Sequence, residues 1–145
     1  MLKISLTKNF KNFEEKFKYF YKYRFDDDYL KYNFNKKKYK KKSSKEWFKQ
    51  NSNNKLLNKI KLNNKIIGLI GYNLDNFLYF IVIDKKRRNL GIGTIVLKKI
   101  FSKLKRKNYN IKTMINKKNK SSLRLHRKFN FKVIKKTGIF FTLKL

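Results

Sequence analysis

The stretch Arg88-Asn89-Leu90-Gly91-Ile92-Gly93-Thr94 joins an apolar run at 77–83 to a segment whose apolar residues recur with a helical period. The pattern predicts a strand, a glycine turn and a helix. Two glycines let the backbone approach an anion closely, and the first amide groups of a helix carry a partial positive charge. The stretch therefore fits a pyrophosphate site, although such glycines also serve ordinary turns. It is neither a dinucleotide fingerprint, because residue 96 is Val, nor a P-loop, because Gly-Lys-Ser/Thr is missing.

Apolar periodicity on both sides of this turn predicts one domain, 1–145, of the α+β class. Phe10, Phe13, Phe17 and Phe20 recur at helical spacing, and Ser43 and Ser44 are candidate caps for a short helix that carries Trp47. Three apolar segments separated by Asn-Asn and Asp-Asn turns predict an antiparallel meander. The expected strands are 2–6, 56–62, 65–74, 77–84, 111–115, 131–134 and 138–143, with a further helix at about 121–129.

Composition excludes several classes of protein. The 145 residues include no cysteine and one histidine, so a disulfide framework, a thiolate nucleophile and a Cys- or His-rich metal site are excluded, and we expect no metal. No apolar run approaches the roughly 20 residues that span a bilayer, and the N-terminus lacks the features of a signal peptide. We therefore expect a cytoplasmic protein with no membrane partner.

The net charge of +33 arises from 41 Lys+Arg against 8 Asp+Glu. Ala and Pro are absent while Lys, Asn and Ile abound, a composition typical of AT-rich coding DNA, so much of the charge is attributable to codon drift. Such a field attracts phosphates in a salt-dependent way. Because the charge is spread over the chain and accompanies no known reader motif, we do not expect nucleic acid as a specific partner.

Two motifs resemble a known family. The stretch at 88–94 resembles the Arg/Gln-x-x-Gly-x-Gly/Ala motif of the GNAT family of N-acetyltransferases. The stretch from Asn119 to Phe131, with Ser122, Leu125, His126 and Lys128, resembles that family's later motif Asn-x-x-Ser/Ala-x-x-Leu-Tyr/His-x-Lys-x-Gly-Phe. The motifs occur in the family's order with one strand between them, and 66–72 is similar to its third strand. The motif-bearing part covers about 55–145.

This resemblance implies the GNAT fold, with a mixed, mostly antiparallel central sheet flanked by helices and splayed between strands 4 and 5. It also implies transfer of an acetyl group from acetyl-CoA, as co-substrate, to an amine. The backbone at the end of the fourth strand would bind pantetheine as an added strand does. Other residues would bind the pyrophosphate, the pantetheine arm or, in the case of Lys128, the 3′-phosphate, unless Lys128 is simply a solvated charge. The implied cofactor-binding residues are Ile81, Val82, Ile83, Arg88, Asn89, Leu90, Gly91, Ile92, Gly93, Thr94, Asn119, Ser122 and Lys128.

His126 occupies the position at which the family commonly has a Tyr acid, and the resemblance implies a catalytic role for it. A neutral imidazole is the main form at pH 7, and the positive field disfavours the imidazolium further. His126 would then orient groups or donate weakly, and the alternative is a residue that packs beneath the cofactor. Asn130 replaces the motif's Gly, and Asn tolerates the left-handed backbone that a helix end requires.

The acceptor and the general base remain open at this stage. Met114 stands where ribosomal-protein alanine acetyltransferases have a glutamate base, and candidate bases here are Asp75, Glu46 and Asp26 to Asp28. The segment 23–27, with Trp47 and Phe48, is similar to acetyltransferases of nucleotide-linked amino sugars, but core aromatics plus a helix cap are the slightly favoured interpretation.

Three functions are compatible with these observations. The first is acetylation of a primary amine of a small molecule. The alternatives are a protein or peptide N-acetyltransferase and a non-catalytic RNA- or ribosome-binding protein on the same fold. We expect a monomer or a homodimer.

Overall fold

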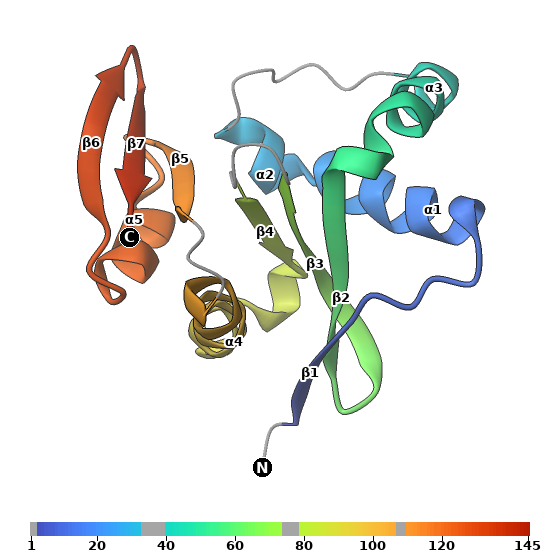
Figure 1. The fold of residues 1–145 in the computed structure, drawn as a ribbon, viewed down its shortest axis with the longest axis horizontal. Helices are drawn as coiled ribbons and strands as arrows, with labels where there is room; N and C mark the ends of the chain where they lie inside the picture. The colour runs from blue at the N-terminus through green and yellow to red at the C-terminus, as the bar shows by residue number, and fades with distance from the viewer. Residues whose placement is uncertain (1–2, 33–39, 74–78, 107–109) are drawn as a thin grey trace.

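The fold was analysed in a computed structural model that describes residues 3–32, 40–73, 79–106 and 110–145. It has the α+β order that the sequence predicts (Figure 1). The N-terminal half comprises β1 (Ile4–Thr7), α1 (Phe13–Arg24), α2 (Asp27–Lys31), α3 (Lys41–Asn51), β2 (Lys55–Leu62) and β3 (Lys65–Asn73). The C-terminal half comprises β4 (Tyr79–Ile83), a 3-10 turn (Lys85–Arg87), α4 (Ile92–Arg106), β5 (Lys112–Asn116), α5 (Lys120–Arg127), β6 (Lys132–Thr137) and β7 (Phe140–Lys144).

The strands form two antiparallel sheets, one of order β1-β2-β3-β4 and one of order β5-β7-β6. The interruption falls between β4 and β5, where the resemblance predicts a splay. The predicted Asn-Asn turn is confirmed, because Asn63 and Asn64 connect β2 to β3 with positive φ angles of 48° and 72°. Because β4 and β5 are not paired, the two sheets separate in the middle of the molecule.

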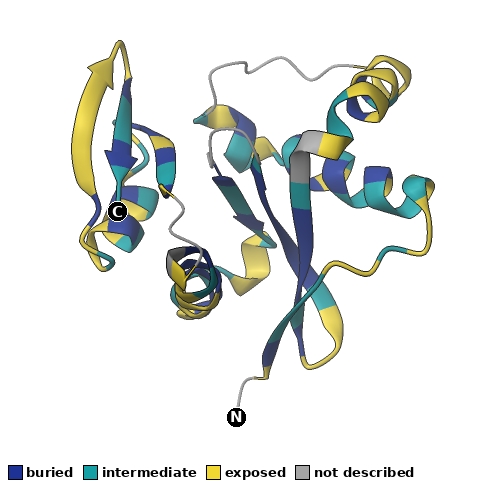
Figure 2. Ribbon diagram, viewed as in Figure 1, coloured by how far each residue is buried: buried dark blue, intermediate teal, exposed yellow. Residues whose placement is uncertain are grey.

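Helix α4 packs on both sheets and joins them into one core. Its buried residues Ile92, Val96, Leu97, Ile100, Phe101 and Leu104 contact side chains of the first sheet and also Ile111, Ile115, Leu123, Phe131 and Leu143. Figure 2 shows buried segments, in dark blue, on α4 and on the strands of both sheets. The turn before α4 is consequently held at the place where the sheets separate.

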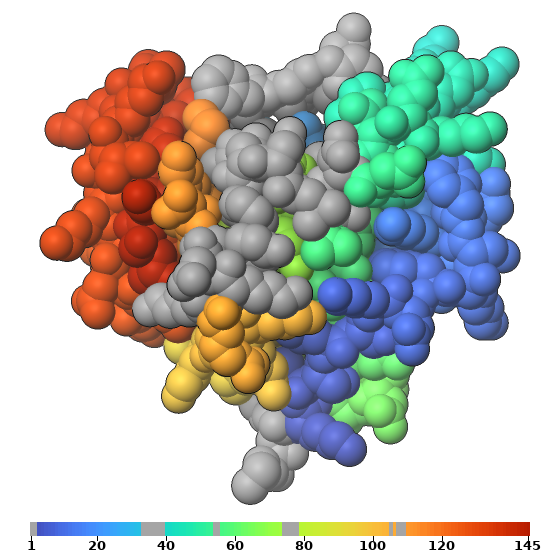
Figure 3. All heavy atoms as spheres, in the orientation of Figure 1, coloured from blue at the N-terminus to red at the C-terminus, as the bar shows by residue number. Residues whose placement is uncertain are grey.

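The other face of the first sheet is covered by α1 and α3 through an aromatic cluster, which comprises Phe17, Phe20, Tyr23, Phe48, Leu57, Leu69 and Val82. The Phe20 and Phe48 rings stack with centroids 4.4 Å apart. The predicted helical face of phenylalanines is confirmed from Phe13 onward. In the space-filling view the helices of this cluster and the C-terminal sheet lie on opposite sides of the molecule (Figure 3).

Two local expectations were wrong or incomplete. Helix α3 begins at Lys41, before the serines, and has no side-chain cap; Ser44 is instead buried within the helix. Lysines are good helix formers, so the helix extends N-terminally past the expected cap. Helix α2 was not expected; its N-cap is Asp26, whose side chain accepts a hydrogen bond from the Tyr29 amide at 3.0 Å.

Candidate active site

A cleft of about 850 Å³ lies between β4 and β5, where the two sheets separate. Within the described part of the chain, Leu90 is the one predicted site residue that does not line it; Leu90 is 52% exposed. The predicted residues that line the cleft are Ile81, Val82, Ile83, Arg88, Asn89, Gly91, Ile92, Gly93, Thr94, Asn119, Ser122, His126 and Lys128. The fold thus brings both sequence motifs to one cavity.

The glycine turn has the backbone that its sequence predicts. Asn89 and Gly91 have φ angles of 60° and 78°, and a Cβ atom on Gly91 would meet nothing within 4 Å. A Cβ on Gly93 would lie 3.2 Å from Cδ2 of Leu125, so Gly93 lets α4 approach α5 closely. No described backbone carbonyl accepts a hydrogen bond from the amide groups of residues 90–94. These amides are available to an anion, as at many helix N-termini.

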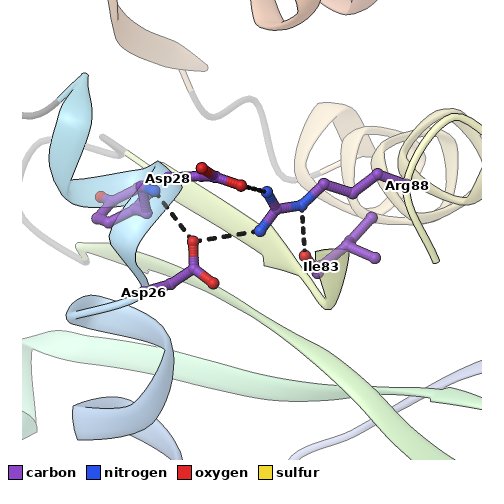
Figure 4. A network of polar contacts seen from close by, with 5 residues as sticks. Asp26, Asp28, Ile83 and Arg88 are labelled. Atoms are coloured by element: carbon purple, nitrogen blue, oxygen red, sulfur yellow. Dashed lines mark hydrogen bonds and ion pairs between the residues drawn. The ribbon is translucent and has the colours of Figure 1, made fainter. Parts of the chain in front are cut away.

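Arg88 lies in the same turn, but its guanidinium is directed at protein groups. Its Nε donates to the Ile83 carbonyl at 2.7 Å, one terminal nitrogen lies 2.5 Å from Asp28 Oδ2, and the other lies 3.2 Å from Asp26 Oδ1 (Figure 4). The resemblance implies that this side chain binds the pyrophosphate. In the structure it links the end of β4 to the start of α2 instead. The partners are about 60 positions away in the chain, so the sequence motif gives no sign of them.

Asn119 and Ser122 lie together at the start of α5. Asn119 caps the helix, because its side-chain oxygen accepts a hydrogen bond from the Ser122 amide at 3.2 Å. The cap uses the amide oxygen and leaves the NH₂ group of Asn119 to donate elsewhere. At the other end of the motif Asn130 has a φ of 62°, which confirms the expected left-handed conformation.

His126 is buried on the inner face of α5, with only 2% of its surface exposed. Its Nδ1 lies 2.7 Å from the Ser122 carbonyl oxygen. A carbonyl can only accept, so Nδ1 carries the proton, and Nε2 of the neutral ring is an acceptor. Nε2 is buried and has no hydrogen-bond partner among the described residues.

Burial lowers the pKa of His126 below its usual range, and the hydrogen bond to Ser122 opposes this only in part. The ring stacks on Tyr79, with centroids 5.7 Å apart, and meets Phe131 edge-on at 5.1 Å. The neutral side chain therefore presents a lone pair, whereas an acid would need an N–H at Nε2.

A sequence model described as the Acetyltransferase (GNAT) family matches residues 14–131. The chain belongs to this family. The match includes most of the N-terminal half, which the motifs did not cover, and ends before the last hairpin. No match to a curated protein is found.

Solved structures of GNAT acetyltransferases, and of one protein described only as a domain, share the fold at low identity. The domain from Methanocaldococcus jannaschii has 19% identity and a TM-score of 0.85, with 100% of this chain and 99% of that chain covered. The spermidine N-acetyltransferase from Vibrio cholerae, in complex with CoA and spermine, has 12% identity and a TM-score of 0.74, with coverage of 97% and 92%. The PaiA N-acetyltransferase from Thermoplasma acidophilum, in complex with coenzyme A, has 15% identity and a TM-score of 0.68, with 98% of each chain covered.

Sequence analysis missed the wall of the GNAT cleft that α2 forms. Asp28, Tyr29, Lys31 and Tyr32 line the cavity there, and the Tyr29 ring lies 6.0 Å from that of Phe80 on β4. The one signal for this wall was the run Asp26-Asp27-Asp28. Further lining residues outside the motifs include Tyr79, Arg87, Thr113, Met114, Ile115, Asn116 and Arg124.

The candidate bases are not equally placed in this GNAT-family protein. Asp28 is the one acidic residue among the described residues that line the cleft, and it is paired with Arg88. Asp27 and Glu46 are exposed, and Asp75 lies outside the described residues. The structure therefore brings one candidate carboxylate to the cleft.

The residues that suggested a nucleotide-linked amino sugar are mostly core residues. Tyr23, Phe25 and Phe48 are 2%, 7% and 0% exposed. Trp47 is exposed and stacks on Phe20 at 6.2 Å. Because none of these side chains is among those lining the described cleft, their interpretation as core aromatics is the one that the packing supports.

None of the described helices is long and apolar enough to cross a bilayer. In the described ranges no three His, Cys, Asp or Glu side chains gather as a metal site would require.

Proposed function

We propose that this GNAT-family protein is an acetyl-CoA-dependent N-acetyltransferase that acts on a primary amine of a small molecule, with residues 1–145 as one catalytic domain. The observation that carries the proposal is the cleft between β4 and β5. The glycine turn and the start of α4 form one of its ends, and α2 forms another of its walls. A phosphate-binding turn and a separate polar wall along one cavity suit a reaction of two substrates.

The residues present fit acetyl-CoA. The space beside Gly91, which a side chain would fill, and the amide groups of residues 90–94 suit a pyrophosphate. The backbone of Ile81 and the amide group of Ile83 lie at the β4 edge that faces away from β3 and suit pantetheine, whereas the Ile83 carbonyl already accepts a hydrogen bond from Arg88. The NH₂ group of Asn119 would contact the same arm, and Lys128 would meet the 3′-phosphate.

When bound, acetyl-CoA supplies an acetyl group activated as a thioester for attack by a neutral amine. An amine with a pKa near 8 is partly neutral at pH 7, whereas one near 10.4 is almost wholly protonated. We assign to His126 the role of a proton acceptor or orienting group at Nε2, since its proton lies on Nδ1. The thiolate leaving group has a pKa near 8.5 and needs little help from an acid.

The charge of the cleft supports a class of acceptor. Lys31, Arg87, Arg88, Arg124 and Lys128 line it, and the one described acidic residue among its lining, Asp28, is paired with Arg88. We therefore propose a small amine that carries an anionic group, such as an aminated sugar phosphate. Such a group should lower KM in a manner that weakens with salt.

The test of cofactor binding is calorimetric titration with acetyl-CoA and with CoA at about 0.3 M salt, which screens unspecific attraction. A Gly91→Glu/Gly93→Glu variant places carboxylates in the turn. The matched control is Gly138→Glu, because Gly138 also has a positive φ, 54°, and open space, but lies in the β6–β7 turn.

We expect one-to-one binding in the wild type and the control, and loss of binding in the turn variant. Release of free CoA thiol is then measured with amino sugars, their phosphates, polyamines and peptides. Absence of binding in the wild type would overturn the proposal, and turnover of peptides alone would favour the protein N-acetyltransferase.

A further inference from the structure

The guanidinium of Arg88 has protein partners for all three of its nitrogen atoms. Nε bonds the Ile83 carbonyl, and the two terminal nitrogens bond Asp28 and Asp26 (Figure 4). The planar fork of an arginine suits this arrangement, because two terminal donors meet two carboxylates while Nε meets a carbonyl. A lysine could not make these contacts together. The contacts tie the end of β4 to the first turn of α2.

Acidic residues are few in this chain. It has 8 acidic residues against 41 basic ones, and two of the eight hold Arg88. The side chains of Arg88 and Asp26 are 28% and 26% exposed, so this pair is partly removed from solvent. Ion pairs of this kind are worth more than fully exposed ones. Oδ1 of Asp26 also accepts the Tyr29 amide, so the same oxygen caps α2 and binds Arg88.

Helix α2 depends on such contacts for its position. It has five residues, too few for a helix to be stable by itself. It is held by burial of Leu30, by the ring contact of Tyr29 with Phe80, and by the Arg88 tie. Its residues Tyr29 and Lys31, and its C-cap residue Tyr32, line the cleft. Whatever fixes α2 therefore fixes that wall of the cleft.

An anion in the glycine turn does not need Arg88. The amide groups of residues 90–94 have no described backbone partner, and Arg87, Arg124 and Lys128 line the same cleft. An anion that recruited Arg88 would have to displace two charge-assisted bonds, each stronger than a neutral hydrogen bond. The backbone amides can be used at no such cost.

We propose that Arg88 is a positioning residue that fastens α2, and with it the wall carrying Tyr29, Lys31 and Tyr32, to the end of β4, while the pyrophosphate is bound by the backbone of the glycine turn. The inference rests on the proposed function for the identity of the ligand. It assigns Asp26 and Asp28 to the fixing of this wall, and so removes both from the set of general bases.

The test combines hydrogen exchange of α2 with CoA binding by calorimetry at about 0.3 M salt. The variants are Arg88→Gln, Arg88→Lys, Asp26→Asn/Asp28→Asn and the combination of Arg88→Gln with both Asn changes. Asn caps helices as well as Asp does, so the double Asn variant keeps the cap and removes the charges. The control is Arg87→Gln, which removes one neighbouring positive charge from the cleft.

We expect amide exchange in residues 27–32 to rise about tenfold or more in Arg88→Gln, in Arg88→Lys and in the double Asn variant. The combined variant should exchange no faster than the single changes, because they break one network. CoA affinity should differ from that of Arg87→Gln by less than about threefold.

Two results would overturn the proposal. The first is unchanged exchange in α2 upon loss of Arg88. The second is a loss of CoA affinity in Arg88→Gln about tenfold greater than in Arg87→Gln, with tighter binding in the double Asn variant, which would make Arg88 the pyrophosphate ligand. If the wild type does not bind CoA, the proposed function fails, but the exchange measurements still decide whether Arg88 holds α2.

Discussion

The two faces of the first sheet differ in what covers them. On β4, Phe80 and Val82 point to the aromatic cluster under α1 and α3, whereas Tyr79, Ile81 and Ile83 point to the side of α4 and the cleft. The aromatic face is closed by ring-to-ring packing. The cleft face retains amide groups with no described backbone partner and a buried Nε2 on His126. One face of β4 is thus covered by packed rings, whereas the other packs on α4 and borders the cleft in which we place the proposed reaction.

The largest expected effect is on the aromatic face. Phe48→Ala removes a side chain with 0% exposure and should lower the free energy of unfolding by about 3–5 kcal/mol. Urea titration followed by circular dichroism measures it, with Trp47→Ala as the neighbouring control, for which we expect less than about 1.5 kcal/mol. CoA affinity of the folded variant should not change. A marked loss of affinity would mean that the two faces are coupled.

Two asparagine helix caps allow a second comparison, because one lies on a helix of the aromatic face and the other on a helix that lines the cleft. Asn12 caps α1 by accepting from the Glu15 amide at 2.9 Å, and Asn119 caps α5 in the same way. Replacing either by Ala should cost about 0.5–2 kcal/mol. Only Asn119→Ala should also weaken CoA binding.

Asn119→Asp separates the two roles of this residue. It keeps the cap oxygen and removes the NH₂ donor, so stability should return while CoA binding stays weak. Recovery of full affinity in Asn119→Asp would show that Asn119 acts only as a cap.

The smallest effects concern pH, where each face has a buried titratable group. The lowered pKa of His126 means that the unfolded state binds the proton more readily, so stability should fall as pH drops through about 6.5. On the aromatic face, burial raises the pKa of Tyr23, so stability should fall as pH rises above about 10. Melting temperatures across pH measure both.

Single substitutions test which residue causes the loss of stability at acid pH and which causes it at alkaline pH. His126→Gln should flatten the acid limb and leave the alkaline limb, while Tyr23→Phe should flatten part of the alkaline limb, because burial also raises the pKa of Tyr79. An unchanged acid limb in His126→Gln would contradict the neutral, buried state of this ring.

The sequence by itself determined the local conformations and the family. The glycine turn, the Asn63-Asn64 hairpin and the left-handed Asn130 follow from the backbone preferences of a few neighbouring residues. Two motifs in the right order also predicted the splay between β4 and β5, and all the predicted site residues except Leu90 line the cleft there. These features are visible in sequence because each depends on residues close together in the chain.

Only the tertiary structure showed which partners the polar side chains bind and which aromatic side chains are buried. Arg88 pairs with carboxylates about 60 positions away, on a helix that the sequence did not predict. The proton of His126 is fixed on Nδ1 by a carbonyl one helical turn earlier and by burial of the ring. The aromatic residues Tyr23 and Phe48 are buried by the packing of α1 and α3 on the first sheet. Such contacts form between distant segments, and their geometry exists only once the core has been packed.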